Sequence, residues 1–175
     1  NIITVRNLPG DTIVGTTAQG QPIGAGRYSF FSLETGQWIS NADSNSTRWD
    51  LAFAGTILRV NNATSGPGGG GAFVYNGTFE SLTSVPTDST FRVDNHPISY
   101  AITRGSGKAW YTYDGPTNLL TPIPGRTLVI RTANGQRAKV EILNYYRGGT
   151  TPSASSADSI KTRDQRFFHF RYSKM

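Results

Sequence analysis

The sequence contains no cysteine. This absence excludes a disulfide scaffold, a thiolate metal site and a cysteine nucleophile. Histidine is almost as scarce, because His96 and His169 are the only two and lie far apart in the chain. No pair of imidazoles therefore has the local spacing of a zinc site.

Charged residues and long apolar runs are also few. Charged residues make up 16% of the chain and hydrophobic residues 36%. No apolar run reaches the roughly eighteen residues that indicate a membrane-spanning helix, so no such segment is expected. The sequence begins at Asn1 without a segment that resembles an export signal, and we interpret it as a mature or trimmed chain that has lost any such signal.

The positive charge is concentrated in the C-terminal third. The net charge is +6, and from Arg126 onward there are ten Lys and Arg against three Asp and Glu, whereas residues 1–125 hold seven against eight. Such a region can attract an anionic ligand, a nucleic acid or an acidic surface. We favour solvated strand faces, because the aromatic residues of this third are typical of a core rather than of an exposed stacking surface. Specific nucleic-acid binding is not expected.

What the sequence does contain is typical of an all-β protein. Its 20 glycines and 9 prolines indicate many turns. Without an internal repeat or a break in composition, residues 1–175 are expected to form a single domain. The patterns predict a short helix at 79–82, irregular or weakly extended structure at 12–26 and a loop at 148–159. They predict strands over residues 1–7, 27–33, 37–39, 49–54, 57–62, 72–75, 91–94, 98–103, 108–113, 126–132, 136–146 and 165–172.

The stretch from Thr47 to Ala72 is expected to organise the fold. Trp49, Leu51 and Phe53 alternate with smaller or polar residues, so one face of this strand is large and apolar. The four glycines at 68–71 cannot pack a core, but they let the backbone approach another segment closely.

The Asn134-Gly135 pair is the strongest hairpin signal in the chain. It separates two long alternating runs. The pair predicts a type I′ turn, since that turn needs positive φ at both central positions.

The common enzyme motifs are missing. Ser65 lacks the strand–turn–helix context of a serine nucleophile. The glycine run is not followed by the Gly-Lys-Ser/Thr of a phosphate loop, and the acidic residues are too scattered to suggest glycoside hydrolysis. A non-catalytic binding protein is therefore favoured over an enzyme.

Few side chains remain as candidates for a binding site. His96 lies in a turn, where an ordinary surface histidine is the plainer interpretation, and His169 is expected to be a half-exposed strand residue rather than a ligand. Trp110 is expected in the core. Tyr113 abuts a loop and could form the wall of a flat apolar pocket.

Several short motifs, in this order and spacing, resemble the HmuY-like haem-binding proteins, or hemophores, of Bacteroidetes. The resemblance extends from Tyr28 to Tyr172. The motifs are Tyr28-Ser29-Phe30-Phe31-Ser32 with Thr35-Gly36, Trp49-Asp50-Leu51-Ala52-Phe53, Ile57-Leu58-Arg59-Val60-Asn61, Thr64-Ser65-Gly66, Gly70-Gly71-Ala72, Val85-Pro86-Thr87, Val129-Ile130-Arg131-Thr132-Ala133-Asn134-Gly135, Ala138-Lys139, Tyr145-Tyr146 and Phe170-Arg171-Tyr172.

The resemblance implies a single HmuY-like domain, an all-β antiparallel sheet fold with long loops and at most short helices. It implies a non-catalytic haem-binding protein of a haem-acquisition system, exposed on the outer membrane as a lipoprotein or released from it. It also implies that haem, held between two axial side chains, is passed to a TonB-dependent receptor. Aromatic and aliphatic walls would cover the porphyrin, and basic residues at the rim could pair with its propionates.

The haem-contacting residues implied by the resemblance are His96, Tyr113 and Asn118. His96 is the candidate axial ligand of the haem iron, since Asp94-Asn95-His96 followed by Tyr100 is similar to the segment that carries one family histidine. The second ligand is expected from the loop 114–118, where many relatives carry a histidine and this sequence has none. Tyr113 could instead bind ferric iron as a phenolate, which requires a lowered pKa. Ligation by two histidines is therefore not expected.

Two other functions stay open. The chain could be an interaction or glycan-binding module on the same fold that has lost haem ligation. Nucleic-acid binding through the basic C-terminal strands is the weakest alternative.

Overall fold

The computed structural model describes residues 1–175 and is an all-β protein. Its two main sheets are a five-stranded sheet in the order β1-β13-β12-β11-β8 and a four-stranded sheet in the order β5-β4-β6-β7. Every neighbouring pair is antiparallel. The expected all-β antiparallel fold is thus confirmed.

The five-stranded sheet forms the long wall of the molecule. It consists of β1 (Ile2–Pro9), β8 (Gly71–Asn76), β11 (Arg126–Arg131), β12 (Arg137–Tyr146) and β13 (Gln165–Lys174). Along β13, Phe168, Phe170 and Tyr172 are fully buried, because alternate side chains of a strand point to the same face. These strands agree with the predicted ones to within a few residues.

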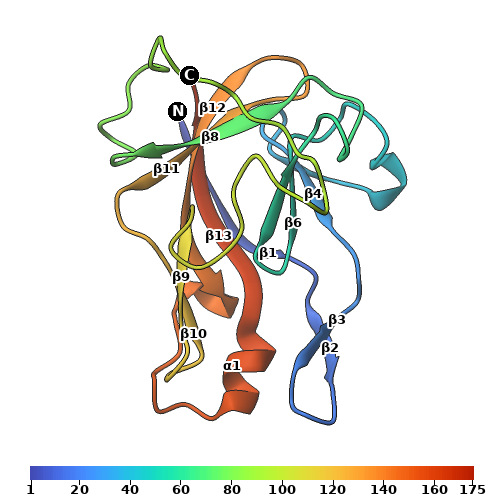
Figure 1. The fold of residues 1–175 in the computed structure, drawn as a ribbon, viewed down its shortest axis with the longest axis vertical. Helices are drawn as coiled ribbons and strands as arrows, with labels where there is room; N and C mark the ends of the chain where they lie inside the picture. The colour runs from blue at the N-terminus through green and yellow to red at the C-terminus, as the bar shows by residue number, and fades with distance from the viewer.

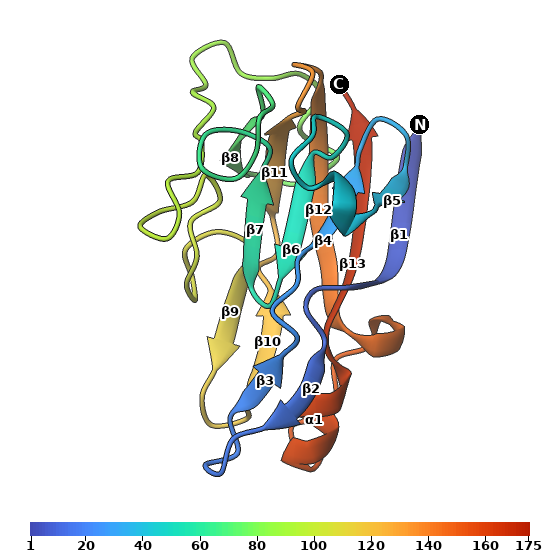
Figure 2. The same cartoon turned by 90° about the vertical axis from the view of Figure 1, so that its right-hand side faces the viewer.

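The four-stranded sheet covers the inner face of that wall (Figure 2). It consists of β4 (Ser29–Ser32), β5 (Gln37–Ile39), β6 (Leu51–Ala54) and β7 (Ile57–Val60), with the short 3₁₀ turn η1 (Asn41–Asp43) between β5 and β6. The ring centroid of Phe53 lies 4.8 Å from that of Phe168 and 5.3 Å from that of Phe170. The aromatic residues of the two inner faces therefore form the core.

The lower end of the molecule is built from two hairpins and one helix (Figure 1). The hairpins are β2 (Ile13–Thr16) with β3 (Pro22–Gly24) and β9 (Tyr111–Asp114) with β10 (Leu119–Pro122). The 3₁₀ turn η2 (Arg147–Gly149) follows β12, and α1 (Asp158–Asp164) precedes β13. No helix has the length and apolar character needed to cross a membrane. Both chain termini lie at the opposite, upper end.

The glycine run packs closely against other segments of the backbone, as predicted from its lack of side chains. A Cβ added at Gly68 would lie 2.7 Å from the Ala133 Cβ and 2.8 Å from the Asn61 carbonyl oxygen. The Gly69 amide donates to the Ala133 carbonyl and the Gly70 amide to the Asn61 carbonyl, both at 2.9 Å. The run thus joins the end of β7 to the β11–β12 hairpin.

The segment between β8 and β9 differs from the prediction. Residues 79–81 form a turn, and no helix forms at 79–82. The Lys139 Nζ, on β12, donates to the Phe79 and Leu82 carbonyls and so holds this segment in place. The strands predicted at 91–94 and 98–103 are wrong. Only isolated bridges form there, between Ala72 and Arg92 and between Asn95 and Ser99.

Three further expectations need correction. The end of the predicted loop at 148–159 belongs to helix α1, which the Ser/Thr-rich sequence did not reveal. Residues 12–26, expected to be irregular or weakly extended, contain the β2–β3 hairpin. The hairpin at Asn134-Gly135 is confirmed, but of these two residues only Gly135 has positive φ, 85°, so the turn is not type I′.

His169 is buried, with 3% of its surface exposed, rather than half-exposed. It lies on the face of β13 opposite Phe168, Phe170 and Tyr172, which the alternation of side chains predicts to lie outside the core. A Cβ added at Gly149 would come within 3.3 Å of the His169 Nδ1. The η2 turn therefore covers this histidine, a contact that strand periodicity cannot reveal.

Candidate functional site

His96 belongs to a group of aromatic and basic side chains that we call the tyrosine–arginine cluster. Its members come from three separate parts of the chain: the entry to β4, strand β7 and the connection between β8 and β9. The cluster consists of Tyr28, Arg59, His96, Tyr100 and Arg104.

Arg59 lies at the centre of this cluster. Its guanidinium carbon is 4.0 Å from the centroid of the Tyr28 ring, and its Nη2 donates to the His96 Nδ1 at 3.2 Å. The His96 ring lies 6.4 Å from the Tyr100 ring, measured between centroids. The Arg104 guanidinium carbon is 5.7 Å from the centroid of Tyr100.

Neither arginine of the cluster forms an ion pair. The Arg59 Nε is buried without a hydrogen-bond partner, a state that costs free energy. Burial raises the pKa of the Tyr28 hydroxyl, and the positive charge of Arg59 opposes that rise. The cluster therefore combines flat aromatic faces with two guanidinium groups that lack a carboxylate.

Asp94 holds the turn that carries His96 against β7. Its buried carboxylate accepts hydrogen bonds from the Val60 amide at 2.9 Å, the Ser65 hydroxyl at 2.7 Å and the Ala101 amide at 2.8 Å. The His96 amide itself donates to the Thr64 hydroxyl oxygen at 2.9 Å. The position of His96 thus depends on the carboxylate two residues before it.

The hydrogen bond from Arg59 decides which nitrogen of His96 carries a proton. A guanidinium group has only donors, so the His96 Nδ1 must accept and the proton of the neutral ring lies on Nε2. An iron-ligating histidine normally has the reverse arrangement, with its second nitrogen donating to an acceptor. In this arrangement His96 is poorly suited to bind iron strongly.

Tyr113 and Asn118 are brought together on the β9–β10 hairpin. The Tyr113 hydroxyl donates to the Asn118 Oδ1 at 2.7 Å, and the Asn118 Nδ2 donates to the Asp158 carboxylate at 3.2 Å. Both residues line a cavity of about 550 Å³ beside α1. Tyr113 is 49% exposed, but the residues that line this cavity are mostly polar, whereas an apolar pocket was expected.

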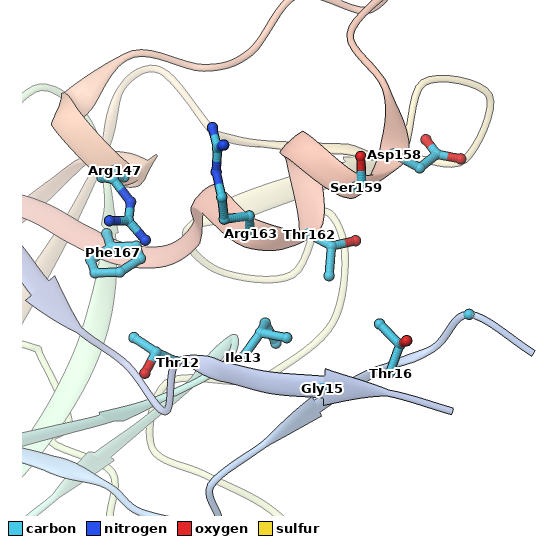
Figure 3. A pocket seen from close by; sticks show the side chains of 11 residues that line it. Thr12, Ile13, Gly15, Thr16, Arg147, Asp158, Ser159, Thr162, Arg163 and Phe167 are labelled. Atoms are coloured by element: carbon cyan, nitrogen blue, oxygen red, sulfur yellow. The ribbon is translucent and has the colours of Figure 1, made fainter. Parts of the chain in front are cut away.

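A second cavity, of about 600 Å³, adjoins the first between β2 and α1 (Figure 3). Its walls carry hydroxyl groups from Thr12, Thr16, Ser159 and Thr162. Arg147 lies over the ring of Phe167, with the guanidinium carbon 4.6 Å from the ring centroid.

The charges around this second cavity are largely matched. The lining residues Arg147 and Arg163 both pair with Asp164, at 3.4 Å and 2.8 Å. Asp158 supplies a further negative charge at the cavity wall. The two adjoining cavities therefore lack a strong net charge.

The structure places the three predicted site residues in two groups. His96 interacts with Arg59 and Tyr100, whereas Tyr113 and Asn118 interact with each other, and no hydrogen bond or aromatic contact joins the two groups. No three His, Asp or Glu side chains gather in an arrangement that could hold a metal ion. The side chains present do not fit a paired axial coordination of haem iron. The two guanidinium groups of the tyrosine–arginine cluster are the kind of group that pairs with carboxylates.

Sequence reasoning did not select Tyr28, Arg59 and Arg104 as candidate site residues. Arg59 stands out as the one charged residue on a short apolar strand, which was an available signal. The meeting of positions 28, 59 and 96 depends on the pairing of β4, β6 and β7, which the sequence does not reveal.

Comparison with known proteins finds a family-level likeness in sequence. A sequence profile described as "HmuY protein" matches residues 26–156. No curated protein matches the chain in sequence at a significant level.

Solved structures share the fold at low sequence identity. Apo PinO from Porphyromonas gingivitis is 14% identical with a TM-score of 0.58, covering 100% of this chain and 97% of its own. A candidate lipoprotein from Bacteroides fragilis is 14% identical with a TM-score of 0.57, and the match covers 98% of this chain and 89% of that one. A candidate HmuY-like heme binding protein from Bacteroides vulgatus is 12% identical with a TM-score of 0.51, and the match covers 98% of this chain and 89% of that protein.

Proposed function

This chain belongs to the HmuY family, and from that membership we propose that it is a non-catalytic protein that binds haem or a similar planar tetrapyrrole. The single observation that carries the proposal is the tyrosine–arginine cluster, in which two guanidinium groups without carboxylate partners lie beside aromatic rings. A haem offers a flat apolar face and two carboxylates, which are the groups that such a cluster recognises.

The binding energy is expected to come from the porphyrin rather than from its iron. Arg59 and Arg104 would pair with the propionate carboxylates, while Tyr28 would contact the ring system. Tyr100, with only 4% of its surface exposed, would support Arg104 from within the protein. His96 remains the candidate contact to iron. Its contribution is expected to be small, because its Nδ1 accepts a hydrogen bond from Arg59.

The family and the lipoprotein among the solved relatives support a place at the cell surface. We expect the protein to be anchored to the outer membrane as a lipoprotein or released from it. A TonB-dependent receptor is the expected partner, to which the ligand would be delivered. Co-purification of such a receptor with the tagged protein would test this part.

Titration with hemin, followed by absorbance at the Soret band, tests the central part. The wild-type protein should give a saturable spectral change. Arg59→Gln and Tyr28→Ala should each weaken binding at least tenfold, since they remove a carboxylate partner and an aromatic face. His96→Ala should change the shape of the band while affinity falls less than tenfold.

Arg27→Gln is the matched control, because Arg27 is exposed and the substitution removes the same charge. It should bind hemin as the wild type does. A wild-type protein without a saturable change, or four variants with equal affinity, would contradict the proposal.

A second candidate function is a glycan-binding module on the same fold. The observation that favours it is the pair of adjoining cavities beside α1, where hydroxyl groups, amides and the Tyr113 ring gather with matched charges. Neutral sugars are recognised by such groups. Retention of defined glycans on an array, lost in Tyr113→Ala, would favour this function over tetrapyrrole binding.

A further inference from the structure

Arg131 and Arg137 lie directly opposite each other in the β11–β12 ladder. Like charges in this position repel each other and destabilise a sheet. Both guanidinium groups also lie over one ring, that of Phe91, with their carbons 5.1 Å and 5.5 Å from its centroid. Neither arginine forms an ion pair.

A cavity of about 560 Å³ opens between these arginines and the segment 85–91. Besides Phe91 and the two arginines, it is lined by the hydroxyl-bearing residues Thr87, Ser89 and Thr90, with an apolar edge at residues 85–86. No carboxylate lines it. Asp88, the only acidic residue of the segment, forms no ion pair.

One side of this cavity is held in place and the other is free. The Arg131 Nε donates to the Gly69 carbonyl at 2.8 Å, and its Nη2 donates to the Gly70 carbonyl at 3.3 Å. The Phe91 ring packs edge-on against Phe73, with the centroids 5.1 Å apart. The Arg137 side chain is exposed and makes no hydrogen bond within the chain, so its donors remain available.

We propose that this cavity binds a sugar that carries a phosphate or sulfate ester. The oxyanion would lie between the two guanidinium groups, which suit tetrahedral oxyanions and would no longer repel each other. The hydroxyl groups of Thr87, Ser89 and Thr90 would bond to the sugar. The volume exceeds the roughly 30 Å³ that one water occupies in the liquid, so it has room for more than a bare ion.

This site is separate from the tyrosine–arginine cluster, since no residue is common to both. It accounts for part of the positive charge of the C-terminal third. If sugar-ester binding at this cavity failed in an experiment, the proposal of tetrapyrrole binding would be unaffected. Failure of tetrapyrrole binding would likewise leave the proposal for this cavity unaffected.

Isothermal titration calorimetry at low ionic strength, with glucose 6-phosphate, glucose 6-sulfate, inorganic phosphate and glucose as probes, tests the proposal. Both esters should bind saturably, at least threefold more tightly than inorganic phosphate, and glucose should not bind. Raising the salt concentration should weaken binding, because ions screen an exposed charge.

Substitutions test whether the esters bind at this cavity. Arg137→Gln should weaken binding of both esters at least tenfold, and Arg137→Lys should weaken it several-fold, since an ammonium group lacks the two-pronged geometry. Arg27→Gln removes the same net charge elsewhere and should change the affinity less than twofold. Thermal unfolding of each variant checks that it is folded.

Three results would overturn the proposal. The first is the absence of saturable binding of either ester. The second is an equal loss of affinity in Arg137→Gln and Arg27→Gln, which would indicate a general charge effect. The third is equal affinity for inorganic phosphate and the esters, which would remove the role given to the hydroxyl groups. Selective binding of one ester would support the site and show whether its natural ligand is a phosphorylated or a sulfated sugar.

Discussion

Asp50 and Ala133 lie far apart in the sequence, yet the Asp50 Oδ1 accepts a hydrogen bond from the Ala133 amide at 2.9 Å. The other carboxylate oxygen accepts from the Leu33 amide at 2.7 Å. Burial raises the pKa of Asp50, and the hydrogen bonds from Ala133 and Leu33 oppose that rise. One side chain at the start of β6 therefore connects the end of β4 with the β11–β12 hairpin.

Replacing Asp50 should cost stability because it leaves two backbone amides without partners. We expect Asp50→Ala to lower the free energy of unfolding by about 2–6 kcal/mol, given about 1–3 kcal/mol for each of the two unsatisfied buried donors. Asp50→Asn keeps one acceptor and should cost less. Urea unfolding followed by tryptophan fluorescence measures both. Equal stability of Asp50→Ala and the wild type would contradict the role given to this residue.

Gly68 tests whether the glycine run is required for packing. A Cβ at this position would contact Ala133 and the Asn61 carbonyl, which cannot move without disturbing the hairpin. Gly68→Ala should therefore lower stability by about 1–3 kcal/mol, the usual cost of overpacking. Gly115→Ala is the matched control, since a Cβ there meets nothing within 4 Å, and it should be nearly neutral. A similar small effect of both would show that the run is not tightly packed.

His169 should make stability depend on pH. Both ring nitrogens are buried and neither has a hydrogen bond of normal geometry. Burial lowers the pKa of the ring below its ordinary value, and a backbone contact with Tyr146 opposes this shift only in part. As pH falls below about 6.5, the unfolded chain takes up a proton that the folded protein resists, so stability falls, by up to about 1.4 kcal/mol per pH unit. This loss ends at the pKa of the folded state.

His169→Leu removes the titrating group and two unpaired polar atoms. We expect this variant to lose less stability than the wild type between pH 7 and pH 5, as measured by thermal unfolding. Arg27→Gln is the control, because Arg27 is exposed and arginine does not titrate between pH 5 and pH 7, and it should keep the pH dependence of the wild type. An unchanged pH dependence in His169→Leu would show that another group is responsible.

Asp94 should control ligand binding mainly through the backbone beside Arg59 and Tyr100, since its carboxylate accepts from the Val60 and Ala101 amides. Asp94→Ala removes the acceptor of the Val60 and Ala101 amides, which should loosen the turn and weaken hemin binding at least tenfold. Ser65→Ala removes only the hydroxyl contact to this carboxylate and should weaken binding less than threefold. Binding that is unchanged in a folded Asp94→Ala protein would contradict this dependence.

The sequence predicted the long strands well because their side chains alternate without interruption. In β13, Phe168, Phe170 and Tyr172 identify the buried face directly. The connection between β8 and β9 could not be predicted in this way. Its backbone is held by side chains, the carboxylate of Asp94 and the ammonium group of Lys139, rather than by a strand ladder.

The candidate site was predicted only in part for the same reason. His96, Tyr113 and Asn118 could be chosen from local sequence. That Arg59 donates to the His96 Nδ1 depends on contacts between distant segments. Such a contact decides the chemistry of the imidazole, and no spacing within the sequence reveals it.

The most direct test of the account compares hemin with metal-free protoporphyrin IX in the wild-type protein. Both offer the same ring and the same carboxylates, but only hemin offers iron. Fluorescence quenching of the tryptophans measures each dissociation constant. We predict affinities within about tenfold of each other, a difference of about 1.4 kcal/mol. A protein that binds hemin more than a hundredfold more tightly, or that binds neither compound, would contradict the account.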